Sequence, residues 1–596
     1  MHLLDWLIVA GYVVVSLLVG VTMTRKASEN LQEFYLAGRS LPWWVAGTSL
    51  VATSFSADTP LFVAGLVRKE GVFGNWFWWS TAFAAIATVF FFARLWRRLD
   101  IVTDVEFLIV RYEDSPARTV LRVFRVLFDG VLVNCIIMAS VTLAASKLIQ
   151  TMLQLSDEAL VTLPLIGGIT ATTLVMLVLG LIALVYTTLS GLYGVVYTDL
   201  IQFGLAMIGA ISLAVAAYLA AAAKGPVMPQ ITALKEYHEQ QTHMFPPIEG
   251  GGLALFTFLV YVLFSWWGAA PGNGFAIQRL LATRSERDSM LAFLWYSVCH
   301  FVVRSWPWIM VGLISMIFFP TLDDPETAYP LMIDKFLPVG LKGIMVASLL
   351  AAFMSTLDTH LNWGSSYLIN DLYKPHLKPG GSDKHYVAAA RWSMVLLTAA
   401  MLIVTTQITG ILEAYKYLGV LTAGIGTVMV ARWYWWRVNV YSEVSAMIAS
   451  LVIGNLVSIL LPDQTHADGT FATYFGHRFL INMVGSTVIW VGITLLMGNE
   501  PSEQAKAFFR KTGVGGPGWR RVAESTHTTL PAMGFGYLFL GWITGCVFIL
   551  GLLLGVGEVL FIRPVPAVIY IGVSIAAGVL LVTYFSSLFR NRDTVS

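Results

Sequence analysis

The sequence predicts an all-α polytopic membrane protein with about fifteen transmembrane spans, and three observations lead to this fold class. Hydrophobic residues make up 57% of the 596 residues and charged residues only 12%, and the mean hydropathy is +0.73, which excludes a soluble protein. About fifteen apolar stretches are long enough to cross a bilayer as helices. Two of these stretches are interrupted at their centres, which indicates irregular backbone inside the membrane.

The predicted spans follow one another along the chain, and most of the loops between them are short. They are 3–23, 42–67, 73–95, 123–148, 166–188, 193–221, 253–280, 292–319, 341–371, 387–408, 412–433, 440–461, 478–497, 534–558 and 566–588.

Lysine and arginine orient these spans. The first span contains Asp5 where a signal peptide would be basic, and Arg25 and Lys26 follow it, so we expect a retained helix. With the N-terminus outside, the cytoplasmic loops carry 26 lysines and arginines and the outer loops 8. We therefore expect a multi-pass protein of the plasma membrane, the inner membrane of a bacterium, with its C-terminus in the cytoplasm. The net charge of +2 gives no indication of nucleic-acid binding.

The second span contains Asp58 and Pro60 at its centre. Pro60 has no N–H and its ring collides with the carbonyl of Ser56, so we expect that carbonyl to lose its helical partner. A carboxylate at mid-depth adds roughly 2.5–3.5 kcal/mol if it faces lipid. Two interpretations stay open. The helix is unwound and lines a cation or substrate site, or it has a proline kink with Asp58 as a cap.

The seventh span contains three glycines and Pro271 within seven residues, so its centre is not expected to be a regular helix. Spans two and seven lie five apart, and groups of five spans starting at each would have opposite topology. The sequence therefore predicts a five-plus-five inverted repeat with a discontinuous first helix in each half. The expected units are an extra N-terminal helix with its loop, the two five-helix repeats and additional C-terminal helices, at 1–41, 42–222, 253–433 and 440–596.

A stripe of small and hydroxyl side chains follows one face of the ninth span. Its members are Ala352, Ser355, Thr356 and Thr359, at positions i, i+3, i+4 and i+7. Several neutral oxygens are what a weakly bound Na⁺ requires, but such hydroxyls also bond to their own helix. Asp358 and His360 lie beside the stripe and keep both interpretations open.

Two further charged residues are expected inside spans. Asp199, in the sixth span, is either a capping or interface residue or a ligand for a second Na⁺ or a proton. Arg304, in the eighth span, either pairs internally with Asp58 or Asp358 or binds a carboxylate on the substrate.

Five motifs make the sequence resemble the sodium/solute symporter family, whose members include sodium/glucose, sodium/proline and sodium/sialic acid cotransporters. They are FYLAGRSLPWW (34–44), SLVATSFSAD (49–58), SGLYGVVYTDLIQ (190–202), IQRLLATRS (277–285) and MSTLDTHLNWGSSYLINDLYK (354–374). The resemblance covers roughly residues 5–500. It implies a LeuT-type inverted-repeat core with helices added at both ends.

The resemblance also implies cation sites. The family's sodium site corresponds to the backbone carbonyls of Ala52, Phe55 and Ala352 and the hydroxyls of Ser355 and Thr356. Its second cation or proton site corresponds to Asp199 with Ser355, Asp358 and Thr359. Asp358 departs from the family, in which this position is commonly a hydroxyl.

Candidate substrate-binding residues follow from the same resemblance and from the lone Arg304. They are Asp58, Thr59, Trp78, Trp267, Arg304 and Tyr415. The positions that contact sugar in glucose-type relatives fall on four of these residues, and the set is not sugar-like. We therefore expect an anionic or zwitterionic substrate, with Arg304 nearest its carboxylate.

The sequence thus predicts a symporter with Na⁺ as coupling ion that imports a small polar organic solute, a carboxylate or an amino acid-like compound, through the lipid bilayer by alternating access. One alternative is a solute sensor on a transporter fold, but residues 498–596 supply no signalling domain. A second is an H⁺-coupled symporter. An enzyme is not expected, because no nucleophile–base set or metal-ligand spacing is present. The sequence does not set the oligomeric state.

Overall fold

The computed structural model describes the chain except for a set of short segments. These are residues 13, 16–36, 102–103, 156–158, 164–166, 172–173, 176, 179–180, 182–183, 185–191, 234–238, 247, 249–251, 273, 466–470, 498–499, 529–533 and 591–596.

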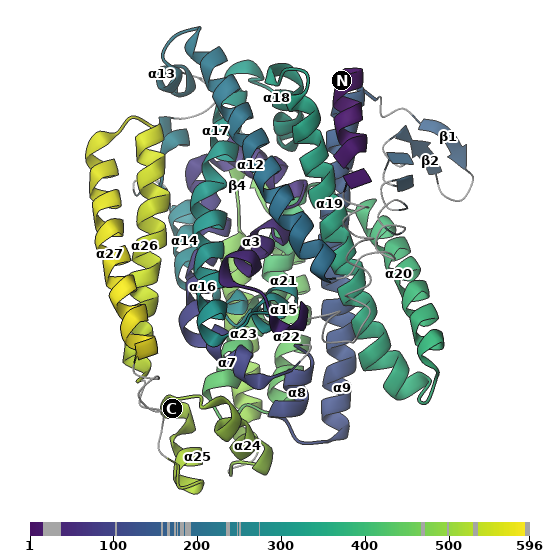
Figure 1. Cartoon of the computed structure of the whole chain (residues 1–596), viewed down its shortest axis with the longest axis vertical. Helices are drawn as coiled ribbons and strands as arrows, with labels where there is room; N and C mark the ends of the chain where they lie inside the picture. Colours follow the sequence, from purple (N-terminus) through teal and green to yellow (C-terminus); the bar gives the residue numbers. More distant parts are fainter. Residues whose placement is uncertain are drawn as a thin grey trace.

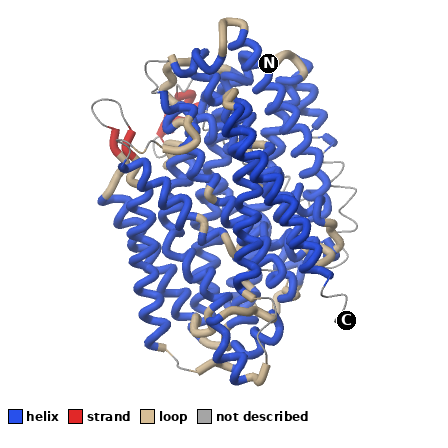
Figure 2. Tube along the Cα trace, turned by 90° about the vertical axis from the view of Figure 1, so that its left-hand side faces the viewer, coloured by secondary structure: helices blue, strands red, loops and turns tan. Residues whose placement is uncertain are grey.

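Helices build almost the whole molecule (Figure 2). In the first half they are η1 (Ala37–Arg39), α3 (Trp43–Thr53), α4 (Asp58–Glu70), η2 (Val72–Asn75), α5 (Trp76–Trp79), α6 (Thr81–Ala87), η3 (Thr88–Phe92), α7 (Ala93–Leu99), α8 (Glu106–Arg111), α9 (Pro116–Arg125), η4 (Val126–Val133), α10 (Asn134–Leu153), α12 (Leu192–Ala222), α13 (Val227–Thr232) and η5 (Glu239–Thr242).

The second half continues in the same way. Its helices are α14 (Gly252–Val260), η6 (Tyr261–Ser265), η7 (Trp267–Ala269), α15 (Gly274–Leu281), α16 (Glu286–Ser297), η8 (Val298–Val303), α17 (Ser305–Phe318), η9 (Pro325–Thr327), α18 (Ala328–Phe336), α19 (Leu341–Ser366), η10 (Tyr367–Leu377), α20 (Asp383–Thr405), α21 (Ile411–Tyr434), α22 (Val440–Leu460), α23 (Phe475–Leu496), α24 (Glu503–Thr512), η11 (Pro517–Trp519), α25 (Arg520–Ser525), α26 (Phe535–Leu560) and α27 (Pro564–Arg590).

Within the described residues, 12 helices are long and apolar enough to cross a membrane, or 13 if the bent pair α3–α4 counts as one span. The sequence predicts about fifteen, and the difference concerns 3–23 and 166–188. The first is helical over Leu3–Tyr12 and at residues 14–15, and its remainder lies outside the described residues.

The prediction for 166–188 is wrong at its start. Strand β1 (Ala159–Leu163) pairs antiparallel with β2 (Gly167–Thr170), so the residues that were expected to open a helix form a hairpin. Two adjacent glycines weaken helix formation there, and the β-branched residues beside them favour a strand. The remainder of this predicted span lies mostly outside the described residues. A second small hairpin joins β3 (Gln464–Thr465) to β4 (Phe471–Ala472).

The second predicted span is broken, as expected, by a bend of 62° between α3 and α4. The position of the break differs from the prediction. Pro60 lies in the first turn of α4, where its missing N–H has no helical partner to lose, and the carbonyl of Ser56 accepts the N–H of Thr59 at 3.3 Å. The non-helical residues are Ser54 to Ala57, upstream of the proline.

The seventh predicted span is also interrupted. It runs through α14, the π-helical η6 and the short η7, and α15 starts after a turn that contains Gly272 with φ of +77°. Because a side chain rarely adopts this backbone conformation, glycine suits the turn. The carbonyl of Ala270 accepts the hydroxyl of Thr88 at 2.7 Å, and that of Pro271 accepts the Trp96 indole N–H.

The two interrupted helices lie in the middle of the molecule (Figure 1). Helix α3 contacts α12, α16 and α19, and η7 contacts α21. The pair α26–α27 stands at one edge, where α26 packs on α6 and η3, whereas α20 lies at the opposite edge. Helices α24 and α25 lie at the lower end, away from α13 and α18 (Figure 1).

Candidate ion and solute site

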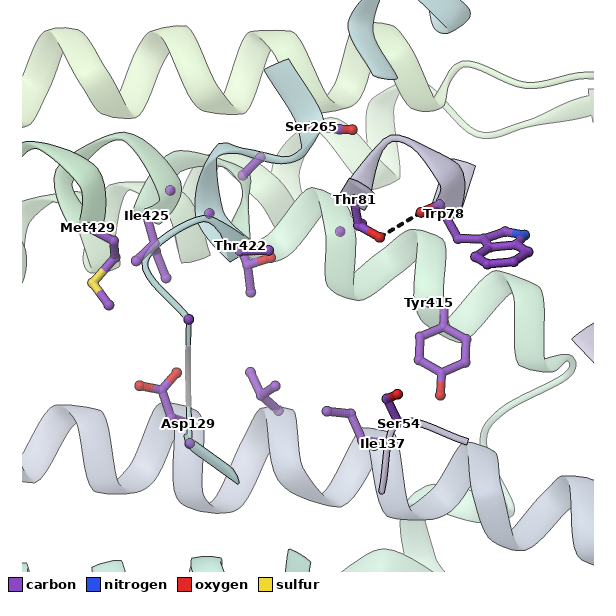
Figure 3. Close-up of a pocket in the computed structure, with 18 of the residues that line it drawn as sticks. Ser54, Trp78, Thr81, Asp129, Ile137, Ser265, Tyr415, Thr422, Ile425 and Met429 are labelled. Carbon is purple, nitrogen blue, oxygen red and sulfur yellow. Dashed lines mark hydrogen bonds between the residues drawn. The ribbon is translucent and has the colours of Figure 1, made fainter. Parts of the chain in front are cut away.

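A cavity of about 500 Å³ lies between the two breaks and the helices η4, α10 and α21. Its size falls within the range of about 300–1,000 Å³ that is usual for pockets that bind small molecules. All six candidate substrate-binding residues line it: Asp58, Thr59, Trp78, Trp267, Arg304 and Tyr415. In Figure 3, Ser54, Trp78 and Tyr415 gather at one end of the cavity and Asp129 lies at the other.

Asp58 occupies the first end. It is 2% exposed, it begins α4, and its carboxylate accepts hydrogen bonds from the hydroxyls of Tyr415 and Thr59. Beyond this end, Lys416 forms an ion pair with Glu70 at 2.7 Å. This ion pair joins the end of α4 to the start of α21.

Several aromatic rings line the cavity together with Asp58. The ring of Phe62 lies 5.8 Å from that of Tyr415 and 6.0 Å from that of Phe77. Trp78 lies 5.8 Å from the ring of His300, and both line the cavity. The first end of the cavity, called the aromatic box below, therefore combines one carboxylate with the aromatic lining residues Phe62, Phe77, Trp78 and Tyr415.

Arg304 hydrogen-bonds to the backbone at the first break. It donates to the carbonyls of Val51 and Ser54, each at 3.2 Å, and it contacts His300. Of the two expected roles, internal pairing with Asp58 or Asp358 does not occur, because the guanidinium forms no ion pair with any carboxylate in the described part of the chain. Its internal partners are the carbonyls that the break leaves free.

The other end of the cavity carries charges that sequence reasoning missed. Asp129, on the π-helical η4, lies 3.6 Å from Arg125, and Tyr367 donates to Asp104 at 2.8 Å. Arg432 also lines this end and pairs with a glutamate of α22 at 3.4 Å. Their sequence positions are typical of cytoplasmic loops and helix ends, so only the fold reveals that they face the cavity.

The candidate sodium site lies where α3 and α19 meet, outside the lining of the cavity. Thr356 is buried and its hydroxyl has no hydrogen-bond partner among the described residues. The carbonyl of Ala52 accepts the N–H of Phe55 at 3.1 Å, which leaves one lone pair free. Ala352 is buried on the same helix as Thr356. A buried hydroxyl without a partner, where α3 and α19 meet, fits one ligand of a hard cation such as Na⁺.

Ser355 differs from this arrangement because its hydroxyl lies 3.3 Å from the carboxylate of Asp199. Asp199 is fully buried on α12, and it also accepts the hydroxyl of Ser49 at 2.7 Å and that of Thr53 at 3.4 Å. Asp199 thus joins α12 to α3 and α19. It does not cap the end of a helix.

Arg279 is a second residue that sequence reasoning missed. It lies at the cytoplasmic end of the predicted span 253–280, where an arginine is expected to face the cytoplasm, yet Arg279 is 2% exposed and donates to the hydroxyl of Thr53 at 3.0 Å. It lies within electrostatic range of both Asp199 and Asp358. The motif IQRLLATRS, which contains it, is the signal that could have identified it.

The remaining candidates lie along α19. Asp358 is buried and accepts the side-chain amide of Asn362 at 2.8 Å, and Thr359 is half-buried. His360 lines the cavity and bonds to the side chain of Asn134. The structure therefore brings Asp199, Ser355 and Arg279 into one cluster, and it links Asp358 to that cluster through Arg279.

Comparison with known proteins gives consistent findings. A family model described as the sodium:solute symporter family matches residues 34–452. The chain is 26% identical over 482 residues to a sodium/glucose cotransporter of Vibrio parahaemolyticus, covering 75% of this chain and 84% of that protein. It is 24% identical over 489 residues to a sodium/mannose cotransporter of Bos taurus, covering 76% and 78% of the two chains.

Among solved structures, the fold is similar to that of a Na⁺-coupled sialic acid symporter in a substrate-bound outward-open state. The TM-score is 0.63 at 17% sequence identity, and the match covers 84% of this chain and 99% of the other. At this identity the likeness concerns the fold alone.

Proposed function

The chain belongs to the sodium:solute symporter family, and on that premise we propose that it imports a small polar organic solute by alternating access. It is a multi-pass, LeuT-type helical membrane protein and a Na⁺-coupled symporter, not an enzyme. One observation carries the proposal about the solute. The cavity touches the first break through Ser54 and Asp58, and two of the five candidate sodium ligands, Ala52 and Phe55, belong to the same broken helix, so ion and solute share this element.

Sodium and solute act on opposite sides of this break. Na⁺ at the carbonyls of Ala52, Phe55 and Ala352 and the hydroxyls of Ser355 and Thr356 holds α3 against α19. The solute fills the cavity beside Asp58. Each ligand fixes the backbone that the other requires, so binding of one favours binding of the other. This linkage is what couples the ion gradient to the solute.

The available driving force is sufficient for accumulation. One charge that moves through about 100 mV supplies roughly 2.3 kcal/mol. A tenfold Na⁺ gradient adds about 1.4 kcal/mol. Together they support accumulation of a solute without net charge by a few hundredfold.

The geometry supports a state in which the outer end of the cavity is closed. Lys416–Glu70 and Lys69–Glu413 join α4 to α21 beyond Asp58. The excess of lysine and arginine on one side supports an orientation with the N-terminus outside and the C-terminus in the cytoplasm, in a plasma membrane such as a bacterial inner membrane. In this orientation the end that carries Asp129 faces inward.

A second coupling ion is proposed at Asp199 and Asp358, as Na⁺ or as H⁺. Asp199 gathers hydroxyls from α3 and α19, which are the two helices of the candidate sodium site. Arg279 lies near both carboxylates, so a cation here competes with a guanidinium for the same charges.

Uptake into proteoliposomes tests the proposed function. Purified protein is reconstituted, and accumulation of labelled solutes is followed with a Na⁺ gradient, with equal Na⁺ on both sides, and with a proton gradient alone. We expect accumulation above equilibrium only with the Na⁺ gradient. Binding of a solute without accumulation would instead favour a sensor, and accumulation with the proton gradient alone would favour an H⁺-coupled symporter.

A further inference from the structure

We propose that the transported solute is a zwitterion, with its ammonium group on Asp58 and its carboxylate on Arg304. The inference rests on the proposed function and adds the substrate class. It follows from two buried charges of opposite sign that line one cavity and do not pair with each other.

Asp58 supplies the negative charge. It is 2% exposed, and its side-chain partners are two neutral hydroxyls, those of Tyr415 and Thr59. No lysine or arginine forms an ion pair with it in the described part of the chain. The backbone N–H groups of Asp58 and Thr59 also face this carboxylate, so all of its hydrogen-bond donors within the described residues are neutral and its charge has no cationic partner. An ionised carboxylate at this depth is costly unless a cation or a water-filled cavity faces it.

Arg304 supplies the positive charge. It is 1% exposed and donates to two backbone carbonyls, and its Nε–H is buried without a hydrogen-bond partner among the described residues. A guanidinium has five N–H donors, so its contacts with the break leave capacity for a carboxylate. Asp58 and Arg304 lie within electrostatic range of each other, but they form no ion pair. A molecule that carries both charges can bridge this separation.

The aromatic box supports the placement of the ammonium group at Asp58. Phe62, Phe77, Trp78 and Tyr415 line the same cavity as this carboxylate, Tyr415 donates to it, and Figure 3 shows Trp78 and Tyr415 at that end. A cation over an aromatic face is attracted by the quadrupole of the ring, and more strongly so when water is excluded. The box therefore favours a cationic group beside Asp58 over a hydroxyl.

The opposite end of the cavity serves as an internal comparison. There Asp129 pairs with Arg125 at 3.6 Å, and Arg432 pairs with Glu443 at 3.4 Å, so these charges are satisfied without a ligand. A neutral polyol at the first end would bring no opposite charge to Asp58 or to Arg304. An anion would bring one to Arg304 alone, and an amine would bring one to Asp58 alone. Only a zwitterion satisfies both.

The test uses uptake by the full chain in proteoliposomes with a Na⁺ gradient. The zwitterionic probes are the twenty proteinogenic amino acids, 4-aminobutyrate and glycine betaine. The neutral probes are glucose, mannose and myo-inositol, the anionic probes acetate, lactate and succinate, and the cationic probes choline and putrescine. We expect Na⁺-driven accumulation of at least one zwitterion and of none of the others. Accumulation of any neutral, anionic or cationic probe, or of no zwitterion, overturns the inference.

Derivatives of the transported zwitterion then test each charge on the wild-type protein, so folding of a variant does not limit the result. N-acetylation removes the ammonium group and amidation removes the carboxylate. Each should weaken competition for uptake by about 100-fold or more, because buried charges in the site are left unpaired. Equal competition by either derivative shows that the corresponding contact does not exist.

Two variants assign the charges to residues. Asp58→Asn should reduce the affinity for the zwitterion far more than the affinity for its N-acetyl derivative. Arg304→Lys should reduce the affinity for the zwitterion far more than the affinity for its amide. Asp334→Asn is the matched control, because Asp334 pairs with Lys342 outside the cavity. It should leave the affinities for the zwitterion and for both derivatives unchanged. Unchanged selectivity in both cavity variants contradicts the assignment.

Failure of this inference is distinguishable from failure of the proposed function. Na⁺-driven accumulation of a neutral solute leaves the symporter intact and removes only the zwitterion. Absence of Na⁺-driven accumulation for every probe removes both.

Discussion

The two interrupted helices free backbone carbonyls in the same region, but the structure satisfies them differently. At the first break, Val51 and Ser54 accept hydrogen bonds from the guanidinium of Arg304. At the second break, Ala270 and Pro271 accept hydrogen bonds from the neutral side chains of Thr88 and Trp96. In hydrocarbon an unsatisfied carbonyl costs several kcal/mol, so both arrangements stabilise an irregular backbone.

The difference indicates a division of roles. The donors at the second break are a neutral hydroxyl and a neutral indole, and neither lines the cavity. Arg304 lines the cavity, lies near Asp58 and carries a charge that a ligand can share. The first break is therefore suited to respond to ligands, whereas the second is a fixed turn that shapes the cavity wall.

The largest expected effect is that of Arg304→Leu. It removes one of the two side-chain donors to the carbonyl of Val51, the guanidinium donor to the carbonyl of Ser54 and the charge in the cavity, and a lost partner costs about 1–3 kcal/mol. We expect a lower melting temperature and loss of uptake. Trp96→Phe, which removes one neutral donor from the second break, should lower the melting temperature by less and leave Na⁺-dependent uptake measurable. Equal loss of uptake in the two variants would show that the breaks do not differ in role.

Removal of the hydroxyls of the candidate sodium site should have the next largest effect. In Ser355→Ala/Thr356→Ala, the Na⁺ concentration for half-maximal uptake should rise by about tenfold or more, equivalent to about 1.4 kcal/mol of ion binding. Ser348→Ala is the control, because this buried serine on α19 donates to the carbonyl of Met345 in its own helix. A normally expressed double variant with wild-type Na⁺ dependence would rule out the site.

The third prediction concerns Asp199 and Asp358, the proposed site of a second coupling ion. Asp199 contacts α3, the helix that ends at the first break. We expect Asp199→Asn or Asp358→Asn to lower the Hill coefficient for Na⁺ or to flatten the pH dependence of uptake, while the main site keeps its affinity. The measurement is the charge moved per solute in proteoliposomes. If these carboxylates are structural instead, both variants will lose stability and the surviving protein will keep the wild-type ratio.

The smallest expected effect is at the second break. Thr88→Val keeps the shape of the side chain but removes the hydroxyl that donates to Ala270, with a cost of about 1 kcal/mol in stability. Thermal unfolding should show a small shift, and apparent affinities for Na⁺ and solute should not change. A large change in Na⁺ affinity would mean that this break also responds to the ion.

Much of the architecture could be predicted from the sequence because a helix that crosses a bilayer needs a long apolar stretch. The lysines and arginines of the loops then mark where each stretch ends. Both interruptions were predicted, since proline and clustered glycine cannot continue a helix. The position of the first break was not, because Pro60 is tolerated in the first turn of a helix and the chain unwinds upstream of it. The pairing of Ala159–Leu163 with Gly167–Thr170 was missed because the prediction relied on the apolar character of the stretch 166–188 and not on its paired glycines.

For the site, the sequence by itself determined the residue types that are costly in a membrane, such as Asp58, Asp199 and Arg304, and hence where a site was to be expected. Only the tertiary structure decided what each of them faces. Arg304 meets free carbonyls of a neighbouring helix, and Arg279 turns inward beside Asp199, because these partners lie more than 70 residues away in the chain. Helical periodicity specifies a face of one helix, but the packing of several helices selects which faces meet.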